Sequence, residues 1–349
     1  MLKRKIDSYI RNFYETSRNA LLITGARQTG KTFSIREFGK SFKSFVEINF
    51  VENPEAVEVF KGAKDSEDIL LRLSAMTTVP LIKGETLVFF DEVQKCPEMV
   101  TAIKFLVDEG SYRYILSGSL LGVELKDLRS EPVGYMGVKE MFPLDFEEFV
   151  TCVEVGERVM SSLRHAWENR MPVDDFVHSK MMELFRLYLV VGGMPAAVQE
   201  YINTGDFMRV KSIHDEIYRL YKMDFTKYEV RNKLKLIKTY DLIPSELNSK
   251  NKRYIFKNLD SELRYERYEN SFNWLESAGV SLPCYNVTEY MIPLEASKKS
   301  NLFKLFLSDV GMLTSLYGTA TILELLDRGK NINCGAMFEN VIAQELKAH

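Results

Sequence analysis

Residues 20–38, ALLITGARQTGKTFSIREF, decide how the first part of the chain folds. They begin with a short apolar run, ALLIT, which predicts a buried strand. The next segment, Gly25 to Thr32, matches the pattern G-x-x-x-x-G-K-[ST]. The residues after it, FSIREF, are spaced as in a helix. Strand, glycine loop and helix in this order are the setting in which the pattern binds phosphate.

Each residue type in this loop has a chemical reason. Gly25 and Gly30 let the backbone curl so that N–H groups face a β-phosphate at the positive end of a helix. Lys31 reaches the β- and γ-oxygens, and the Thr32 hydroxyl suits Mg2+. The loop therefore predicts that the chain binds ATP or ADP with Mg2+. The expected contact residues are Gly25, Ala26, Arg27, Gln28, Thr29, Gly30, Lys31, Thr32 and Phe33.

Two carboxylates, Asp91 and Glu92, follow the apolar run of residues 87–90. Ligands of open α/β sheets bind at the carboxyl ends of the strands. We therefore expect Asp91 to hold Mg2+ and Glu92 to act as the catalytic base that polarises a water molecule. On its own, such a pair more often marks the acidic first turn of a helix than a catalytic site. In a chain that also has a phosphate loop, the catalytic interpretation is the more frequent one.

A serine turn ends another predicted strand, YRYILS at residues 112–117. Ser117 or Ser119 can lie between the loop and the carboxylates and contact the γ-phosphate or the attacking water. We favour Ser117 as a catalytic residue beside Lys31 and Glu92. The alternative is that these serines only form a turn.

Apolar runs alternate with helical stretches in the first part of the chain, at 20–24, 45–50, 86–90, 112–117 and 133–141. This alternation predicts an α/β fold, a five-stranded parallel sheet with helices on both faces, over residues 1–150. Residues 151–225 lack strand patterns and predict a helical segment. Residues 226–318 have the order helix, helix, hairpin of a winged-helix-like domain.

The overall charge does not favour binding to nucleic acid or to acidic membranes, because 46 basic and 49 acidic residues leave a net charge of −3. Four scattered cysteines and four histidines imply neither disulfides nor zinc. Glycines and a proline interrupt the longest apolar run, at 187–198. We expect a cytoplasmic protein that does not enter a membrane.

Positive charge is nevertheless concentrated in one segment. Residues 226–268 hold 11 lysines and arginines against 6 acidic residues, with Tyr254, Tyr265 and Tyr268 among them. Such a segment can track the phosphates of double-stranded DNA. It can equally be a solvated helix face or a protein-binding spacer.

The segments GARQTGKT, LVFFDEVQKCPE, ILSGS and EMFPLDFEEF, in this order, resemble bacterial and archaeal AAA-type (AAA+, STAND-like) P-loop ATPases. The C-terminal half of those proteins is a domain of unknown function, DUF4143. VGGMPAAV at 191–198 and FKLFLSDVGML at 303–313 extend the resemblance over nearly the whole chain. It implies a C-terminal nuclease-like module, of which residues 319–349 match only the first helix. Glu339 alone cannot form a metal-dependent nuclease site.

The resemblance also assigns two further positions. Pro195 is the residue that would pack on adenine, unless it only separates two helices. Many relatives carry a glycine-arginine pair before the fifth strand, where this chain has Gly134 and Tyr135. An arginine can stabilise the transition state for phosphoryl transfer, so its absence implies slow hydrolysis, with Arg129 as the nearest substitute.

The function expected from the sequence is that of an ATPase that hydrolyses ATP with Mg2+ and acts as a nucleotide-dependent switch. The alternative is a nucleotide-dependent DNA-binding or regulatory module with little or no hydrolysis. A small-molecule kinase is disfavoured because no acceptor-substrate signature is present. The sequence leaves a homo-oligomer open.

Overall fold

The computed structural model describes residues 2–119, 134–153, 155–228, 233–251, 253–255, 268–327 and 334–349. The chain divides into two compact units. The N-terminal unit is Arg4–Met141, and the C-terminal unit is Phe142–His349 together with residues 1–3.

The N-terminal unit is built on a five-stranded parallel sheet with the strand order β2-β3-β4-β1-β5. Its strands are β1 (Ala20–Thr24), β2 (Ser44–Asn49), β3 (Thr86–Asp91), β4 (Arg113–Ser117) and β5 (Met136–Glu140). All five lie where the apolar runs predicted them. The α/β fold is therefore confirmed.

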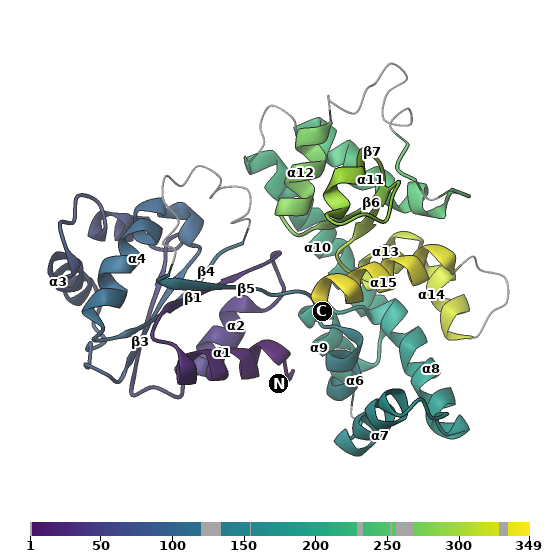
Figure 1. Ribbon diagram of the computed structural model, residues 1–349, viewed down its shortest axis with the longest axis horizontal. Coiled ribbons are helices and arrows are strands. Elements are labelled where there is room, and N and C mark those ends of the chain that lie inside the picture. Colours follow the sequence, from purple (N-terminus) through teal and green to yellow (C-terminus); the bar gives the residue numbers. More distant parts are fainter. Residues whose placement is uncertain are drawn as a thin grey trace. The chain divides into compact units, whose positions relative to one another are not determined.

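Helices cover both faces of this sheet, as Figure 1 shows. They are α1 (Lys5–Thr16), α2 (Lys31–Gly39), α3 (Ser66–Met76) and α4 (Pro97–Glu109), with short 3-10 helices at Pro54–Val59 and Val93–Lys95. Alternate residues of each strand point to opposite faces. Leu21 and Ile23 therefore join the core formed with α1 and α2, while Leu22 joins the core formed with α3 and α4.

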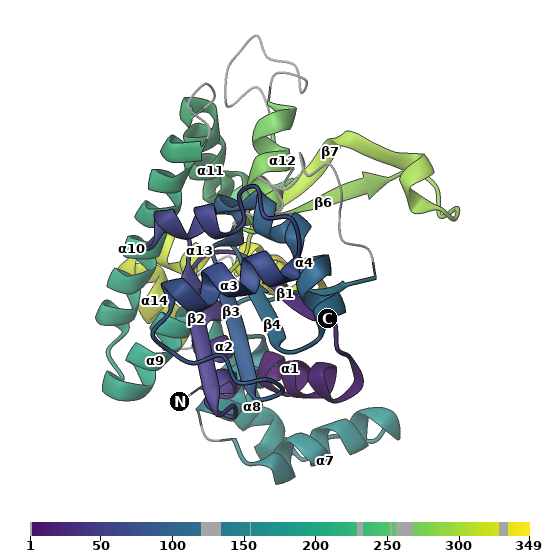
Figure 2. The same cartoon turned by 90° about the vertical axis from the view of Figure 1, so that its left-hand side faces the viewer.

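The described part of the C-terminal unit is mostly helical. Its helices are α6 (Phe146–Cys152), α7 (Glu157–Glu168), α8 (Asp175–Val191), α9 (Pro195–Thr204), α10 (Phe207–Tyr228), α11 (Lys233–Asn248), α12 (Glu269–Ser277), α13 (Val310–Leu316), α14 (Thr319–Leu326) and α15 (Gly335–Ala348), with a 3-10 turn at Leu294–Ser297. An antiparallel hairpin joins β6 (Ser281–Val287) to β7 (Lys298–Leu307). Figure 2 shows its far end extending away from the helices of this unit.

The order α11, α12, β6, β7 is the one that predicted a winged helix. Residues 256–267, between α11 and α12, lie outside the described residues. The winged-helix assignment therefore stays a prediction. Helix α15 packs into the same unit, with Met337, Asn340 and Val341 buried.

The two glycines of VGGMPAAV make close contacts with Leu144 and Asp309 inside the C-terminal unit. The backbone N–H of Gly193 donates to Asp309 Oδ2 at 2.6 Å, and its carbonyl accepts from the N–H of Leu144 at 2.7 Å. A Cβ on Gly193 would lie 2.0 Å from the Leu144 carbonyl oxygen, and one on Gly192 would lie 2.3 Å from Asp309 Oδ1. No side chain fits at either position, so packing accounts for Gly192 and Gly193 and for their contact with Asp309.

These contacts also place the boundary between the units. The segment PLDFEEF was expected to close a first domain ending at residue 150. By their contacts, Leu144 and the helix α6 lie in the compact unit that begins at Phe142, and the domain boundary at residue 150 stays a prediction. Asp145 caps α6 by accepting from the N–H of Glu148 at 2.8 Å.

In the described part of the chain, no single helix is both long and apolar enough to span a membrane. Only α8 and α9 taken together meet that criterion, with a bend of 119° between them.

Candidate active site

The glycine loop between β1 and α2 has positive φ angles at three residues, two of which are glycines. Gly25 and Gly30 have positive φ angles of 129° and 96°, and Gln28 has a φ of 66°. A Cβ on Gly25 would lie 2.1 Å from the carbonyl oxygen of Met141, so only glycine fits there. Positive φ at Gln28 costs about 1–2 kcal/mol, which places local strain within the loop.

Lys31 is the first residue of α2 and lies buried under this loop. Its ammonium donates to the carbonyl oxygens of Gly25 at 2.9 Å and Ala26 at 2.7 Å. Burial lowers the pKa of Lys31 to about 8, although the charges of Glu92 and Asp91 act to raise it. Because α2 has no side-chain cap, its N-terminus and Lys31 together suit an anion.

One contact from outside the phosphate pattern and one within it fix the loop. Arg4 Nη1 donates to the carbonyl of Thr29 at 2.9 Å, and Thr29 Oγ1 donates to the carbonyl of Ala26 at 2.9 Å. The loop backbone is therefore held before any ligand arrives. Phe33, expected among the contact residues, has a side chain that is more than half exposed on α2.

Asp91, at the end of β3, is the centre of a polar cluster. Its Oδ2 accepts from Thr32 Oγ1 at 3.1 Å and from Asn49 Nδ2 at 3.2 Å. Its Oδ1 accepts from the backbone N–H of Glu92 at 3.0 Å and from the Ser117 hydroxyl. Burial raises the pKa of Asp91, and the hydrogen bonds from Ser117 and Thr32 act to lower it. A hydroxyl and a carboxylate in contact form the oxygen-only donor set that Mg2+ prefers.

Glu92 stands next to this cluster in an unusual backbone conformation, with a φ of 57°. Its Oε2 accepts from Ser119 Oγ at 3.0 Å and from the side-chain amide of Gln94. Gln94 is itself buried, and its Oε1 has no hydrogen-bond partner among the described residues. Two donors on one carboxylate oxygen fix the direction of this side chain, as a general base requires.

The two candidate serines have different partners. Ser117, the favoured residue, is fully buried and donates to the predicted metal carboxylate. Ser119 contacts the predicted base. The predicted contact of Ser117 with the γ-phosphate thus stays a prediction, and Ser119 is the serine that contacts Glu92.

The position of the absent arginine lies at the other edge of the sheet. Tyr135 accepts through its carbonyl from the N–H of Ala20 at 2.9 Å, and Gly134 accepts from Asn19. The loop instead leaves the opposite end of β1, where Thr24 pairs with Glu140. An arginine in place of Tyr135 would lie roughly 15 Å away along the strand. The absence of an arginine at this position is therefore no argument for slow hydrolysis, and slow hydrolysis itself stays a prediction. Arg129 lies outside the described residues.

Pro195 and the tyrosines of the basic segment belong to the C-terminal unit. Pro195 is the first residue of α9, a position at which proline starts helices well. Its predicted contact with adenine stays a prediction. Tyr254 and Tyr268 are buried, and the Tyr254 hydroxyl donates to the carbonyl of Thr239 at 2.8 Å. These two rings are core residues and do not present a face to DNA. Tyr265 lies outside the described residues.

Sequence reasoning missed Asn49, Gln94 and Arg4. Asn49 could have been found from strand pairing, because it is the β2 residue in register with Asp91. Gln94 follows the carboxylate pair by two residues, but nothing in the local pattern assigns it to Glu92. Arg4 lies in the turn before α1, and its contact with the loop depends on tertiary packing.

Comparisons with known proteins agree with this geometry. The family model described as an AAA domain matches residues 17–150, and one described as a domain of unknown function (DUF8612) matches residues 182–322. The second differs from the expected DUF4143, so that part of the resemblance is not confirmed. No curated protein matches the chain by sequence.

Among solved structures, the Walker-type ATPase PABY2304 of Pyrococcus abyssi is similar over 91% of this chain and 96% of that chain, with 16% identity and a TM-score of 0.53. The Orc1 protein of Aeropyrum pernix, solved in complex with DNA, is similar over 93% of this chain and 93% of that chain, with 14% identity and a TM-score of only 0.32. The first likeness concerns the fold alone. With the family model, it supports an AAA-type P-loop ATPase domain in the N-terminal unit.

Proposed function

We propose that this chain binds ATP with Mg2+ at the loop from Gly25 to Thr32 and hydrolyses it. The observation that supports the proposal best is the chain of contacts that joins Thr32, Asp91 and Glu92 beside the buried ammonium of Lys31. A phosphate cradle, an oxygen donor set for a divalent cation and an oriented carboxylate then occupy one edge of the sheet. These are the parts that phosphoryl transfer to water needs.

Each residue has a defined part in the reaction. Lys31 and the N–H groups of the loop hold the β- and γ-phosphates, and Thr32 and Asp91 would hold the cation. Mg2+, when bound, would offset the negative charge of the phosphate oxygens. Glu92 accepts a proton from the water whose oxygen forms a bond to the γ-phosphorus. The bond between that phosphorus and the β-γ bridging oxygen breaks, its electron pair stays on ADP, and inorganic phosphate is released.

The proposal favours hydrolysis over a module that only binds nucleotide. A purely regulatory site has no need of a carboxylate held by two donors in a strained backbone. The direct test is phosphate release from Mg-ATP with no acceptor molecule present. We expect release that stops when the metal is chelated. Nucleotide binding without release would favour the regulatory alternative, and transfer to an added metabolite would favour a kinase.

The pH dependence of nucleotide binding should report the ionisation of Lys31. Its pKa of about 8 in the free protein means that the amine is charged below that pH and loses its proton above it. A bound phosphate favours the charged form, so binding takes up a proton at higher pH. We expect the affinity for Mg-ADP to be constant below about pH 8 and to fall by roughly tenfold per pH unit above it.

Calorimetric titrations between about pH 7 and pH 9 check this expectation. Lys31→Arg is the matched control, because a guanidinium keeps its charge over this range. Its binding should not change with pH. A flat profile for the unaltered protein, or proton release on binding, would contradict the assignment of Lys31.

A switch function has support from the contacts of Met141, the last residue of the N-terminal unit, with the phosphate loop. Gly25 packs against the backbone of Met141, and Met141 also donates to the Thr24 carbonyl at 2.9 Å. Met141 is the last residue of the N-terminal unit. A change in the loop on nucleotide binding would therefore reach the chain that leads into Phe142. Amide hydrogen exchange of residues 141–149 should differ between the ADP and ATP-analogue states, and identical exchange would remove this route.

Duplex DNA is a candidate partner through residues 226–268. Lys250 and Arg253 are exposed, which supports an electrostatic contact, whereas the buried Tyr254 and Tyr268 give no stacking surface. We expect weak binding that falls steeply as salt increases, because such a segment neutralises only a few phosphates.

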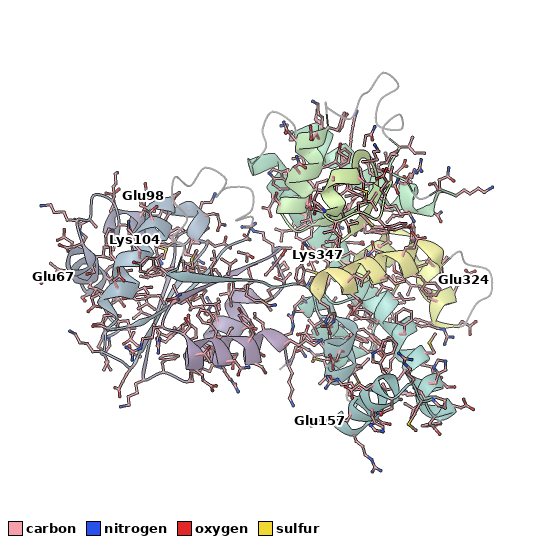
Figure 3. All side chains as sticks on the ribbon, viewed as in Figure 1. Glu67, Glu98, Lys104, Glu157, Glu324 and Lys347 are labelled. Carbon is pink, nitrogen blue, oxygen red and sulfur yellow. The ribbon has the colours of Figure 1, made fainter. Side chains whose placement is uncertain are left out.

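Fluorescence anisotropy with a labelled duplex tests this contact. The double reversal Lys250→Glu and Arg253→Glu should remove most of the binding. Lys347→Glu, an exposed lysine outside the segment that is labelled in Figure 3, is the control. Binding that ignores salt, or that both variants leave intact, would show that this segment is not the contact.

A further inference from the structure

Arg27 lies in the middle of the phosphate loop, and its side chain is directed toward the predicted base. Its Nε donates to Ser119 Oγ at 3.4 Å, and the same hydroxyl donates to Glu92 Oε2 at 3.0 Å. At 3.4 Å the first of these two bonds is long. One serine thus links a loop cation to the carboxylate that activates water.

The loop that carries Arg27 is held on both sides. Thr29, two residues later, binds Ala26 through its hydroxyl and accepts from Arg4 through its carbonyl. The position of the Arg27 Cα is therefore set by a fixed backbone. A cation on a fixed loop can meet a phosphate with little reorganisation.

The charges of Arg27 and Lys31 act on each other. The positive charge of Arg27 contributes to the low pKa of Lys31, behind the larger effect of burial. Two cations gathered around one loop favour a ligand that carries several negative charges. Lys31 lies under the loop carbonyls, whereas Arg27 lies on the side of Ser119 and Glu92, where the γ-phosphate is attacked.

We propose that Arg27 is an arginine within the chain that binds the γ-phosphate of ATP, distinguishes ATP from ADP and stabilises the transition state of hydrolysis. This proposal rests on the proposed function. In the reaction described above, the Arg27 guanidinium donates hydrogen bonds to γ-phosphoryl oxygens and exchanges no atom or proton. Arg27 would thus supply the positive charge at the γ-phosphate that had been expected from an arginine before β5.

The test compares Arg27→Ala, Arg27→Lys and the control Arg11→Ala, which removes an exposed arginine of α1. The measurements are the affinities for Mg-ADP and for a Mg-bound non-hydrolysable ATP analogue, and kcat for phosphate release. Arg27→Ala should leave ADP affinity within about twofold, weaken the analogue by about tenfold or more, and lower kcat by about a hundredfold to a thousandfold. Arg27→Lys should recover part of the affinity but little of kcat, because an ammonium cannot form the bidentate contact. Arg11→Ala should match the unaltered protein.

The outcomes separate this proposal from the proposed function. Equal loss of ADP and analogue affinity would assign Arg27 to the β-phosphate or to loop structure, and overturn the proposal. So would an unchanged kcat in a variant that keeps its melting temperature. If the unaltered protein binds neither nucleotide, the proposed function itself fails.

Discussion

Replacing Glu92 with glutamine is expected to lower the rate of phosphate release by about two to four orders of magnitude while nucleotide affinity changes by less than about twofold. The amide can still accept hydrogen bonds from Ser119 and Gln94, so the side chain keeps its place. It cannot take a proton from water at neutral pH. The measurement is kcat together with the Kd for an ATP analogue.

Glu98→Gln is the matched control for this variant. Glu98 is an exposed carboxylate on α4, labelled in Figure 3, and it has no part in the proposed site. Its replacement should not change kcat. Undiminished turnover in Glu92→Gln would mean that another residue activates the water and that the base is misassigned.

Replacing Lys31 with alanine is expected to remove most of the thermal stabilisation that nucleotide gives. A ligand that binds only the folded protein adds about 2.7 kcal/mol at a hundredfold excess over its Kd. Lys31 supplies the main side-chain charge for the phosphates, so the variant should show almost no shift of Tm at the same concentration of Mg-ADP.

The control for this variant is Lys40→Ala, because Lys40 is an exposed lysine directly after α2. It should keep the full shift of Tm. Equal stabilisation of Lys31→Ala and the unaltered protein would remove the assignment of the loop as a phosphate site.

The sheet and the core of the site could be predicted from sequence because their signals are local. A strand of apolar residues, a glycine loop and a helix start are contiguous in the chain, and so are β3 and its Asp91-Glu92 pair. The side of the sheet on which they meet follows from the parallel order of the strands. Thr32 and Asp91 do meet at this end of the sheet, and their roles as metal ligands stay predictions.

The remaining site residues depend on tertiary packing. Arg4 and Asn49 approach the loop and the carboxylates from separate segments, and no local pattern marks them. Tyr135 lies at the end of β5 that is far from the loop, and a family position alone does not show which end of a strand a residue precedes. Tyr254 is buried, and burial cannot be read from charge spacing.

The C-terminal motifs have a structural role that the sequence left open. Gly192 and Gly193 lie so close to neighbouring atoms that no side chain fits, and the Asp309 carboxylate accepts from the N–H of Gly193. Their function in the described structure is to join Leu144, α8 and α13.

The most direct test of the central claim is hydrolysis of Mg-ATP in water enriched in oxygen-18, followed by mass spectrometry of both products. Attack of a Glu92-activated water on the γ-phosphorus predicts one oxygen-18 atom in each released phosphate and none in ADP. Label in ADP, unlabelled phosphate, or no phosphate from a protein that binds the nucleotide would contradict it.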